Sequence, residues 1–512
     1  MLPVCETSRI VQYLTDESNA FVASPETVSG VFFPESEAEL IDILRSSEEP
    51  VTVSGAGTGL TGARVPMLGG TVISTERMRR TVDNGTGISL ERDSPAGAVR
   101  IHLDESRQHA RVAPGITLAE LDTVLPKDLS YGPDPTERLA SLGGTVATNA
   151  SGARCFYFGP TRSWIDGLRV VLADGDVLVL RRGACAADRD GMLRFRSESG
   201  KEYCVKIPNY RMPQVKNAAG LYSKDGMDLI DLFIGSEGIL GIFSEITVKL
   251  QPAESDIVAD LAFFRSEADA QEAVGRLRAV KERGILAIEY FNGNALDFIR
   301  DQYPEMPHNA RAAVLAELKS DGLKNMDFLA DLLKKHGVLE DWCANNPFDR
   351  RKMKEFRHSL PDSINSFLKQ HDSHKLATDI AVPVAEFPAM MDRYAETGCR
   401  FAEKYPREGK HWVLYGHVGD CHAHFNFITA SEDERRFART LIAELAEFAV
   451  SVGGTLSAEH GVGKKTLLIG GKNVPYLQLM YGVSGLREIA RVKKALDPGT
   501  RLNAGNMVPG NY

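Results

Sequence analysis

The sequence changes from a β-type run to alternating glycines at Val51-Thr-Val-Ser-Gly-Ala-Gly-Thr-Gly-Leu-Thr-Gly62. Glycines allow several backbone N–H groups to point at one anion, so this loop predicts a bound phosphate or pyrophosphate. The glycine spacing also fits a nicotinamide-binding Rossmann unit that would use Glu76. However, Pro66 and a following glycine pair leave no room for its crossover helix before the next strand at Thr71–Ser74. We therefore predict a phosphate-binding loop between two closely spaced strands, with a plain glycine-rich turn as the alternative.

Segments further along the chain repeat this mixture of short strands, glycines and hydroxyls. A strand at Val112 ends in a turn, and Thr117 is placed to cap a short helix. The stretch Ser141–Gly152 is rich in small residues, so a large planar ligand can approach the backbone while Thr148, Asn149 and Ser151 hydrogen-bond it.

Two more segments complete this pattern. Leu168–Leu172 and Val177–Leu180 flank Ala-Asp-Gly-Asp, which predicts a β-hairpin. Asp231–Leu250 reads as a glycine-broken strand. Strands separated by glycine turns are thus expected to dominate residues 30–250.

A second cluster of chemistry-bearing residues lies near the C-terminus, at Gly416-His-Val-Gly-Asp-Cys-His-Ala-His-Phe-Asn426. If Cys421–Phe427 is extended, the period of two places His422, His424 and Asn426 on one face, with His417 across a turn. Imidazoles and one carboxylate are a common catalytic set for zinc, manganese or ferrous iron. Ser-Ala-Glu-His-Gly-Val-Gly at 457–463 offers that carboxylate as Glu459. The alternative is that these histidines are ordinary core or surface residues.

Composition and length exclude several classes of protein. At 512 residues the chain should hold two or three domains. A net charge of −9 without a long basic run argues against a nucleic-acid binder. No stretch reaches the roughly 18–20 apolar residues of a membrane span, and the start lacks the features of a signal peptide. Seven cysteines without a Cys-x-x-Cys pair predict reduced thiols. We expect a cytoplasmic protein without an integral membrane segment; peripheral membrane association stays open.

The middle of the chain mixes strands and helices without strict alternation. Expected strands are Glu254–Phe264, Ile285–Phe291, Ala312–Leu318 and Trp412–Tyr415, and expected helices are Glu267–Arg283, Asn294–Gln302, Asp327–Lys335, Phe387–Tyr405, Arg435–Val452 and Ser484–Leu496. Such a mixture predicts an antiparallel, ferredoxin-like sheet covered by helices, hence an α+β fold.

The quoted motifs resemble a known family. Ser54–Pro66, Pro133–Pro135, Gly143–Gly152 and Ile234–Ile242 are similar to the FAD-binding domain of the vanillyl-alcohol oxidase and p-cresol methylhydroxylase (PCMH) type. The histidine and Glu-His-Gly-Val-Gly elements, with Leu496–Gly505, are similar to the branch of D-lactate, glycolate and D-2-hydroxyglutarate dehydrogenases. The resemblance spans essentially the whole chain. It implies a PCMH-type FAD-binding domain at 1–250, a substrate or cap domain at 251–450, and a C-terminal helical segment at 451–512 that returns to the flavin.

The resemblance also implies site residues. FAD would bind noncovalently, with its pyrophosphate on the glycine loop, where Ala63 and Arg64 replace the usual second small pair. The positions that match flavin-binding ones are Ser54, Gly55, Ala56, Gly57, Thr58, Gly59, Leu60, Pro133, Asp134, Gly143, Gly144, Thr148, Ser151, Gly152, Glu237, Gly238, Ile242 and Asn503. The family's metal ligands fall on His417, His424 and Glu459, with zinc favoured over manganese or iron. Its catalytic base falls on His460, and a substrate-contacting Asn on Asn426.

The chain departs from the family pattern where substrate choice is made. His422 stands at a commonly Asn position, where it either adds a ligand or stacks in the loop. Arg357 is suited to grip a carboxylate, but Pro361 replaces the Thr of hydroxyglutarate enzymes. Thr378–Pro383 resembles the D-lactate enzymes more. Lys375 is a further candidate substrate contact; an exposed Lys375 and a surface Arg357 are the alternatives.

The implied reaction is the oxidation of a D-2-hydroxy acid, D-lactate-like, to the 2-oxo acid. A metal would stabilise the alkoxide, His460 would take the hydroxyl proton, and the Cα hydride would pass to flavin N5. A quinone, an electron-transfer flavoprotein, a cytochrome or oxygen would reoxidise the flavin, and a homodimer is one expected assembly. Two other classes stay open, namely a flavin-free metal-dependent hydrolase and a flavin-binding subunit of a larger redox complex.

Overall fold

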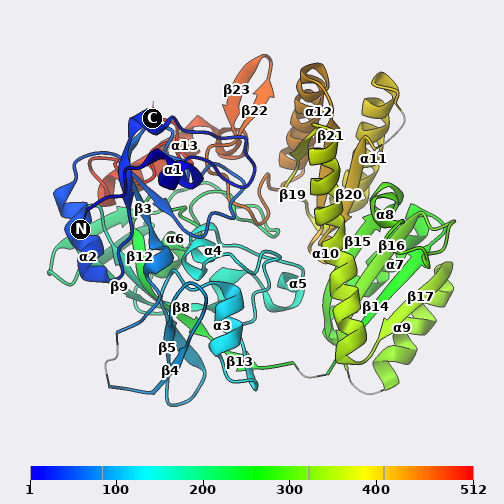
Figure 1. Cartoon of the computed structure of the whole chain (residues 1–512), viewed down its shortest axis with the longest axis horizontal. Coiled ribbons are helices and arrows are strands. Elements are labelled where there is room, and N and C mark those ends of the chain that lie inside the picture. The colour runs from blue at the N-terminus through cyan, green and yellow to red at the C-terminus, as the bar shows by residue number, and fades with distance from the viewer. Residues whose placement is uncertain (1, 83–84, 255, 321–322, 408–409, 511–512) are drawn as a thin grey trace.

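The structure is a computed structural model that describes residues 2–82, 85–254, 256–320, 323–407 and 410–510. Two bodies lie side by side (Figure 1). The first contains β1–β12, with the C-terminal elements packed on it, and the second contains β14–β21 with helices α7–α12. The described residues include no helix that is long and apolar enough to cross a membrane.

A three-stranded parallel sheet carries the glycine loop. Its order is β1-β3-β2, with β1 at Val28–Phe32, β2 at Val51–Ser54 and β3 at Gly70–Ser74. Helix α2 (Glu37–Ser46) connects β1 to β2, whereas only loop and turns connect β2 to β3. Two neighbouring parallel strands are therefore joined by the glycine loop without a crossover helix. This arrangement confirms the predicted loop between two closely spaced strands and excludes a Rossmann unit at this position, whereas phosphate binding by the loop stays a prediction.

A six-stranded antiparallel sheet also belongs to the first body. Its order is β4 (Ile88–Arg92), β5 (Val99–Leu103), β6 (His109–Val112), β12 (Ile242–Lys249), β8 (Ile165–Val171) and β9 (Val177–Arg181). The predicted hairpin is β8–β9, and Thr117 caps α3 (Leu118–Val124) with a complete capping box. The prediction of one broken strand over Asp231–Leu250 is wrong in its first part, because Asp228 caps a short helix, α6 (Leu229–Phe233).

Smaller elements, which include two two-stranded sheets, accompany these sheets. They are α1 (Thr7–Ile10), β7 (Leu129–Ser130), α4 (Leu142–Thr148), α5 (Cys155–Phe158), β10 (Met192–Arg196), β11 (Glu202–Lys206) and β13 (Gln251–Pro252).

The second body is one antiparallel sheet with helices on both faces. Its order is β17 (Val338–Ala344), β14 (Ile257–Phe264), β16 (Ala312–Lys319), β15 (Ile285–Asn292), β20 (Trp412–Gly416), β21 (His422–Thr429) and β18 (His374–Ala377), and β19 (Ile380–Ala381) also pairs with β21. One hydrophobic core joins the sheet to α7 (Glu267–Arg278), α9 (Leu323–Lys335), α11 (Phe387–Lys404) and α12 (Glu432–Ser451), and another joins it to α8 (Gly293–Ile299) and α10 (Pro347–Gln370). The predicted helix-covered sheet is confirmed, although Ser255 of its first predicted strand lies outside the described residues.

The 24-residue helix α10 was not predicted. Pro361 lies inside it, and a proline usually signals a helix end. Its buried side chains Phe356, Leu360 and Ile364 pack on the sheet, so tertiary burial holds the helix through the proline.

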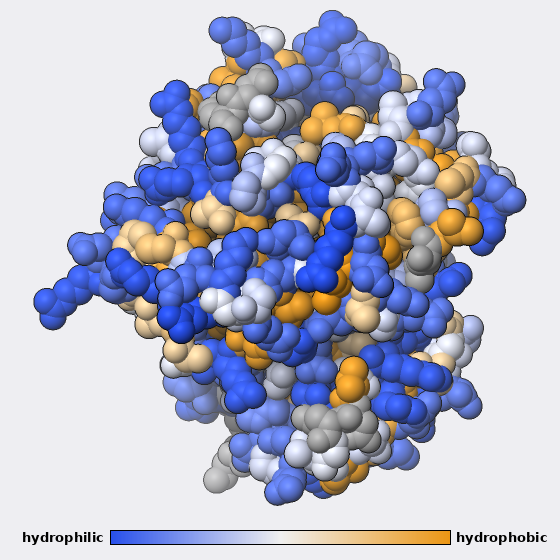
Figure 2. All heavy atoms as spheres, turned by 90° about the vertical axis from the view of Figure 1, so that its left-hand side faces the viewer, coloured by the Kyte–Doolittle hydropathy of each residue, from blue (hydrophilic) through white to orange (hydrophobic). Residues whose placement is uncertain are grey.

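The C-terminal segment returns to the first body, as predicted, but begins with an unpredicted hairpin, β22 (Thr466–Ile469) and β23 (Lys472–Pro475). Helix α13 (Tyr476–Leu496) then buries Leu486, Ile489 and Val492 in the core of the antiparallel sheet. On the face of the molecule nearest α2, hydrophobic residues lie in small groups between hydrophilic ones (Figure 2).

Candidate functional site

Strand β21 presents its polar residues on one face, as the period of two predicts. His422, His424 and Asn426 alternate with Ala423, Phe425 and Phe427, which join the hydrophobic core on the opposite face. A short turn over Val418–Asp420 brings His417 beside them. The ring centroid of His417 lies 5.5 Å from that of His422 and 5.3 Å from that of His424.

The Glu459 carboxylate is the point on which these imidazoles converge. Its Oε1 lies 3.4 Å from His417 Nε2, 3.3 Å from His424 Nε2 and 3.6 Å from His460 Nε2. Its Oε2 lies 3.7 Å from His422 Nδ1. The predicted ligands and the predicted base are therefore brought together in one cluster.

Two further carboxylates hold the outer sides of these rings. Glu289 Oε1 lies 2.6 Å from His417 Nδ1. Asp379 lies 3.0 Å from His422 Nε2 and 3.2 Å from His460 Nδ1. The Ser457 hydroxyl and the His460 backbone N–H both donate to Asp379 Oδ2, which fixes that carboxylate. Each carboxylate directs the opposite ring nitrogen of its histidine into the cluster.

Lys216, which belongs to the first body, supplies a buried positive charge to this cluster. Its side chain is 2% exposed, and its ammonium lies 2.6 Å from Glu459 Oε2 and 4.0 Å from Asp420 Oδ2. It also donates to Gly152 O at 3.3 Å. Lys216 thus links the predicted flavin-binding segment directly to the histidine cluster.

Burial and mutual charge together set the ionisation of the cluster. Burial alone would lower the pKa of His417, but the Glu289 and Glu459 carboxylates outweigh it and raise that pKa to about 9. Burial lowers the pKa of His422 to about 3 and also lowers that of His424. The Lys216 ammonium and His417 overcome burial and hold the pKa of Glu459 well below its usual range. At neutral pH the carboxylate is therefore ionised beside neutral His422 and His424 and a protonated His417.

The donor set fits a divalent cation. One ligand atom from each of His417, His422, His424 and Glu459 lies within 4.8 Å of the others. His417 Nε2 and His422 Nδ1 are buried without a hydrogen-bond partner. Buried polar atoms usually have partners, and nitrogen and oxygen donors of this kind suit zinc, manganese or ferrous iron.

The predicted substrate contacts lie at the rim of this cluster. Arg357, on α10, places Nε 3.1 Å from Glu289 Oε2, and its Nη2 donates to Thr136 Oγ1. Asn426 is buried, and its Nδ2 has no hydrogen-bond partner. Lys375 is exposed on β18 and pairs with Ile428, so it shares a sheet face with Asn426. The structure therefore joins Arg357 to the cluster by an ion pair and leaves Lys375 at a distance along the strand.

The predicted flavin-binding segments also come together. The loop after β2 lies against the start of α4, where Ser141 Oγ would lie 2.6 Å from a side chain at Gly55. Gly57 has φ +89°, and a side chain there would overlap the Arg64 guanidinium. Nothing lies within 4 Å of the side-chain position of Gly59, so this part of the loop faces open space.

The neighbouring loops complete a cradle of backbone and small residues. A side chain at Gly152 would overlap the carbonyl of Asp134, which follows the buried Pro133. Helix α4 holds Gly143, Gly144 and Thr148. Ser151 Oγ is buried without a partner. An open glycine loop and an unpartnered hydroxyl fit a phosphate-bearing planar cofactor.

Other predicted flavin contacts are already engaged with protein. Asn503 Oδ1 accepts from the Val53 N–H at 2.6 Å, and its Nδ2 donates to Glu237 O. The Glu237 carboxylate accepts from the N–H groups of Val462 and Gly463, both at 2.7 Å. The polar side-chain atoms of Asn503 and Glu237 thus tie the cradle to the residues that follow His460. Gly238 follows Glu237, while Ser54 and Ile242 are buried, Ile242 in the core beneath β2.

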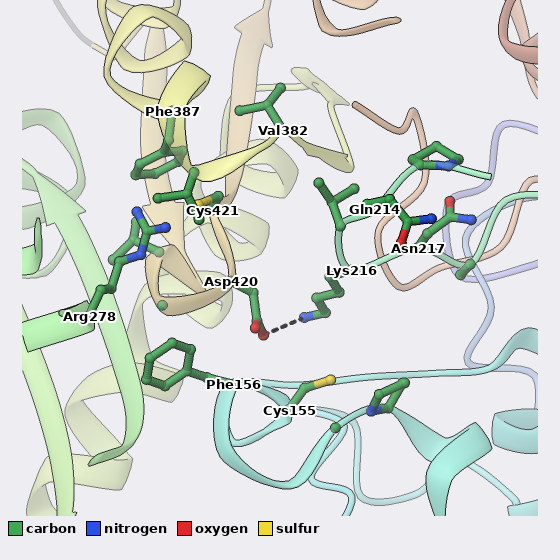
Figure 3. Close-up of a pocket in the computed structure, with 18 of the residues that line it drawn as sticks. Cys155, Phe156, Gln214, Lys216, Asn217, Arg278, Val382, Phe387, Asp420 and Cys421 are labelled. Atoms are coloured by element: carbon green, nitrogen blue, oxygen red, sulfur yellow. Dashed lines mark ion pairs between the residues drawn. The ribbon is translucent and has the colours of Figure 1, made fainter. Parts of the chain in front are cut away.

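A separate cavity of about 1150 Å³ lies between the two bodies, behind the cluster. In Figure 3, Lys216 and Asp420 form an ion pair at the wall of this cavity; Cys155 and Phe156 come from the first body, and Arg278 and Phe387 from the second. The glycine loop does not line this cavity. It is thus a second space beside the Lys216–Asp420 pair.

Sequence reasoning missed Lys216, Glu289 and Asp379 as site residues. Glu289 is the one carboxylate in the apolar strand Ile285–Asn292, and Asp379 stands between Thr378 and the apolar Ile380–Pro383. Lys216 precedes Asn-Ala-Ala-Gly. The signal in each case is a charge inside a segment that is otherwise built for burial.

Comparisons with known proteins match both bodies of the chain to described domain families. A model described as "FAD binding domain" matches residues 28–181, and one described as "FAD linked oxidases, C-terminal domain" matches residues 254–507. The glycolate oxidase subunit GlcD of Bacillus subtilis (strain 168) is 26% identical over 97% of this chain and 91% of its own length. A D-lactate dehydrogenase of Archaeoglobus fulgidus is 25% identical over 98% of both chains. A solved structure of alkyldihydroxyacetonephosphate synthase shares the fold, with TM-score 0.62 and 17% identity over 92% of this chain and 75% of its own.

Proposed function

Because the chain belongs to the FAD-linked oxidases, and is thus an oxidoreductase with a PCMH-type FAD-binding domain, we propose that it oxidises a D-2-hydroxy acid to the 2-oxo acid. The observation that carries the proposal is the buried convergence of three imidazoles on Glu459, beside a fourth imidazole oriented by Asp379. Relatives named glycolate oxidase subunit and D-lactate dehydrogenase support this substrate class.

The chain's residues would hold two groups. The loop from Ser54 to Leu60 and the backbone of Gly143–Gly152 would hold FAD noncovalently, and FAD when bound would accept the Cα hydride at N5. His417, His424 and Glu459 would hold a divalent cation, which when bound would stabilise the developing alkoxide. The Lys216 ammonium neutralises Glu459 Oε2, so that Oε1 faces the histidines.

Arg357 and Asn426 would orient the substrate. The ion pair with Glu289 fixes the Arg357 guanidinium beside the cluster, and its remaining N–H groups can donate to the substrate carboxylate. The unpartnered Asn426 Nδ2 offers a second donor from the sheet face. Lys375, farther along that face, would attract the anion toward the site.

His460 would take the hydroxyl proton. Its Nδ1 faces Asp379 at 3.2 Å, which leaves Nε2 as the free base on the side of Glu459. Its side chain is 28% exposed, more than His417, His422 or His424, so it is the imidazole that a substrate can reach. An imidazole oriented by a carboxylate is suited to general-base work.

The other classes fit less well. A flavin-free hydrolase does not account for the FAD-binding match over residues 28–181. A relative of Arabidopsis thaliana is named D-lactate dehydrogenase [cytochrome], and is 26% identical over 96% of this chain and 75% of its own length. We accordingly propose an external electron acceptor, namely a cytochrome, a quinone or an electron-transfer flavoprotein.

Anaerobic reduction of the purified protein tests the proposal. We expect a yellow protein whose flavin absorption is bleached by D-2-hydroxy acids and not by their L-enantiomers. Chelation of the metal and His460→Ala should each slow bleaching by saturating substrate, and the exposed His308→Ala is the matched control. Bleaching by His460→Ala at the wild-type rate would remove His460 as base. A purified protein without flavin absorption would refute the proposal as a whole.

A further inference from the structure

We propose that His422 is a fourth protein ligand of the divalent cation, so that the site is three imidazoles and one carboxylate. This inference rests on the proposed function, because it concerns the same metal site. His422 is 0% exposed and lies on the face of β21 that carries His424, with ring centroids 4.5 Å apart. Its ligand atom belongs to the group that also includes His417, His424 and Glu459.

The surroundings of His422 point to a missing positive partner. Both ring nitrogens are buried without a well-aligned hydrogen bond. Nδ1 lies on the Glu459 side, 3.7 Å from Oε2, and Nε2 lies 3.0 Å from Asp379 Oδ1. A buried polar atom without a partner is costly, and a bound cation removes that cost at Nδ1.

Asp379 supplies the orientation that a ligand histidine needs. Metal-binding histidines usually direct their second nitrogen at a carboxylate or carbonyl, which fixes the ring and its tautomer. Asp379 does this for His422 through Nε2, as Glu289 does for His417 through Nδ1. Two carboxylate–histidine pairs therefore approach Glu459 from different elements. Glu289 lies on β15 and His417 on the turn after β20, whereas Asp379 lies on the segment after β18 and His422 on β21.

A fourth protein ligand changes which cation suits the reaction. Zinc favours four ligands, and His417, His422, His424 and Glu459 would already supply them. A 2-hydroxy acid that adds its hydroxyl and carboxylate oxygens needs two more positions. Manganese and ferrous iron accept six ligands readily, so they become the expected working metals in place of zinc.

X-ray absorption at the metal edge tests the inference without relying on turnover. Manganese-loaded wild-type protein should show three imidazoles, and His422→Asn should show two. The Kd for manganese, measured against a competing chelator, should rise in His422→Asn by more than about 100-fold, the upper end of the cost of losing an outer-shell partner. The exposed His308→Asn should match wild type in both measurements.

The outcomes separate the two proposals. Two imidazoles in the wild type, or an unchanged count in His422→Asn, overturns the role of His422 and leaves the proposed function standing. A wild type that binds no metal overturns both. If His422→Asn and the second variant His422→Gln fail to fold, the wild-type imidazole count still decides.

Discussion

Replacing Lys216 with an uncharged residue should lower the stability of the metal-free protein and raise the affinity of the protein for the metal. The Lys216 ammonium and Glu459 Oε2 lie 2.6 Å apart, with side chains 2% and 7% exposed. Removing one partner of such a buried pair costs about 3–5 kcal/mol. We take the lower end for Lys216→Met, because protonated His417 still faces Glu459 Oε1 at 3.4 Å.

A thermodynamic cycle converts that loss into an affinity. A bound cation compensates Glu459 in the variant as Lys216 does in the wild type, so most of the roughly 3 kcal/mol returns on binding. That energy corresponds to a metal Kd lowered by about 100-fold in Lys216→Met. The melting temperature of Lys216→Met should fall without metal, and metal addition should raise it more than it raises that of wild type.

Differential scanning fluorimetry and chelator competition check both parts. The control is Lys224→Met, an exposed lysine that lines the same cavity, which should change neither quantity. If metal raised the melting temperature of wild type and Lys216→Met equally, or if the metal Kd of the variant were higher than that of wild type, the compensation argument would be refuted.

Three further changes probe other parts of the molecule. Gly57→Ala should lower the FAD content of purified protein, measured as the ratio of flavin to protein absorbance, because alanine is strained at φ +89° and its methyl group would displace the Arg64 guanidinium within the loop. Gly226→Ala, also at positive φ but facing open space, should retain FAD. Asn503→Ala leaves the partly buried Val53 N–H unpaired, whereas Glu237 O keeps the Asn506 Nδ2 donor, so the change should cost about 1–3 kcal/mol of stability, seen as a lower melting temperature. Burial and the neighbouring Asp341 carboxylate raise the pKa of Asp260 to about 7. The free energy of unfolding is therefore highest below the usual aspartate pKa, where Asp260 is protonated in both the folded and the unfolded state, and it falls as the pH rises from there through 7. Asp260→Asn should therefore be more stable than wild type by up to about 4 kcal/mol at pH 8, and melting curves should show this gain shrinking toward pH 4.

Local periodicity made much of the fold and part of the site predictable. The alternation along β21 placed His422 and His424 on one face, and the short, proline-containing connection after Gly62 excluded a crossover helix. Each of these inferences depends on residues a few positions apart, where backbone geometry dictates the outcome.

The residues that sequence reasoning missed depend on contacts between distant segments. Lys216 reaches Glu459 across 243 positions, and Glu289 reaches His417 across 128. Nothing in their own neighbourhoods specifies those partners. Helix α10 is a related case, since its packing on the sheet overrides the local signal of Pro361. Tertiary burial, rather than local pattern, decides these positions.

The contact between β2 and the segment after α13 bears on how the protein is made. Val51 pairs with Leu502 in parallel, its N–H donates to Arg501 O, and the Asn503 side chain accepts from Val53. A ribosome delivers β2 and its glycine loop long before it delivers residues 501–503. The edge of β2 therefore lacks its native partner for most of translation, and the first body completes its fold only when nearly all of the described chain has been synthesised.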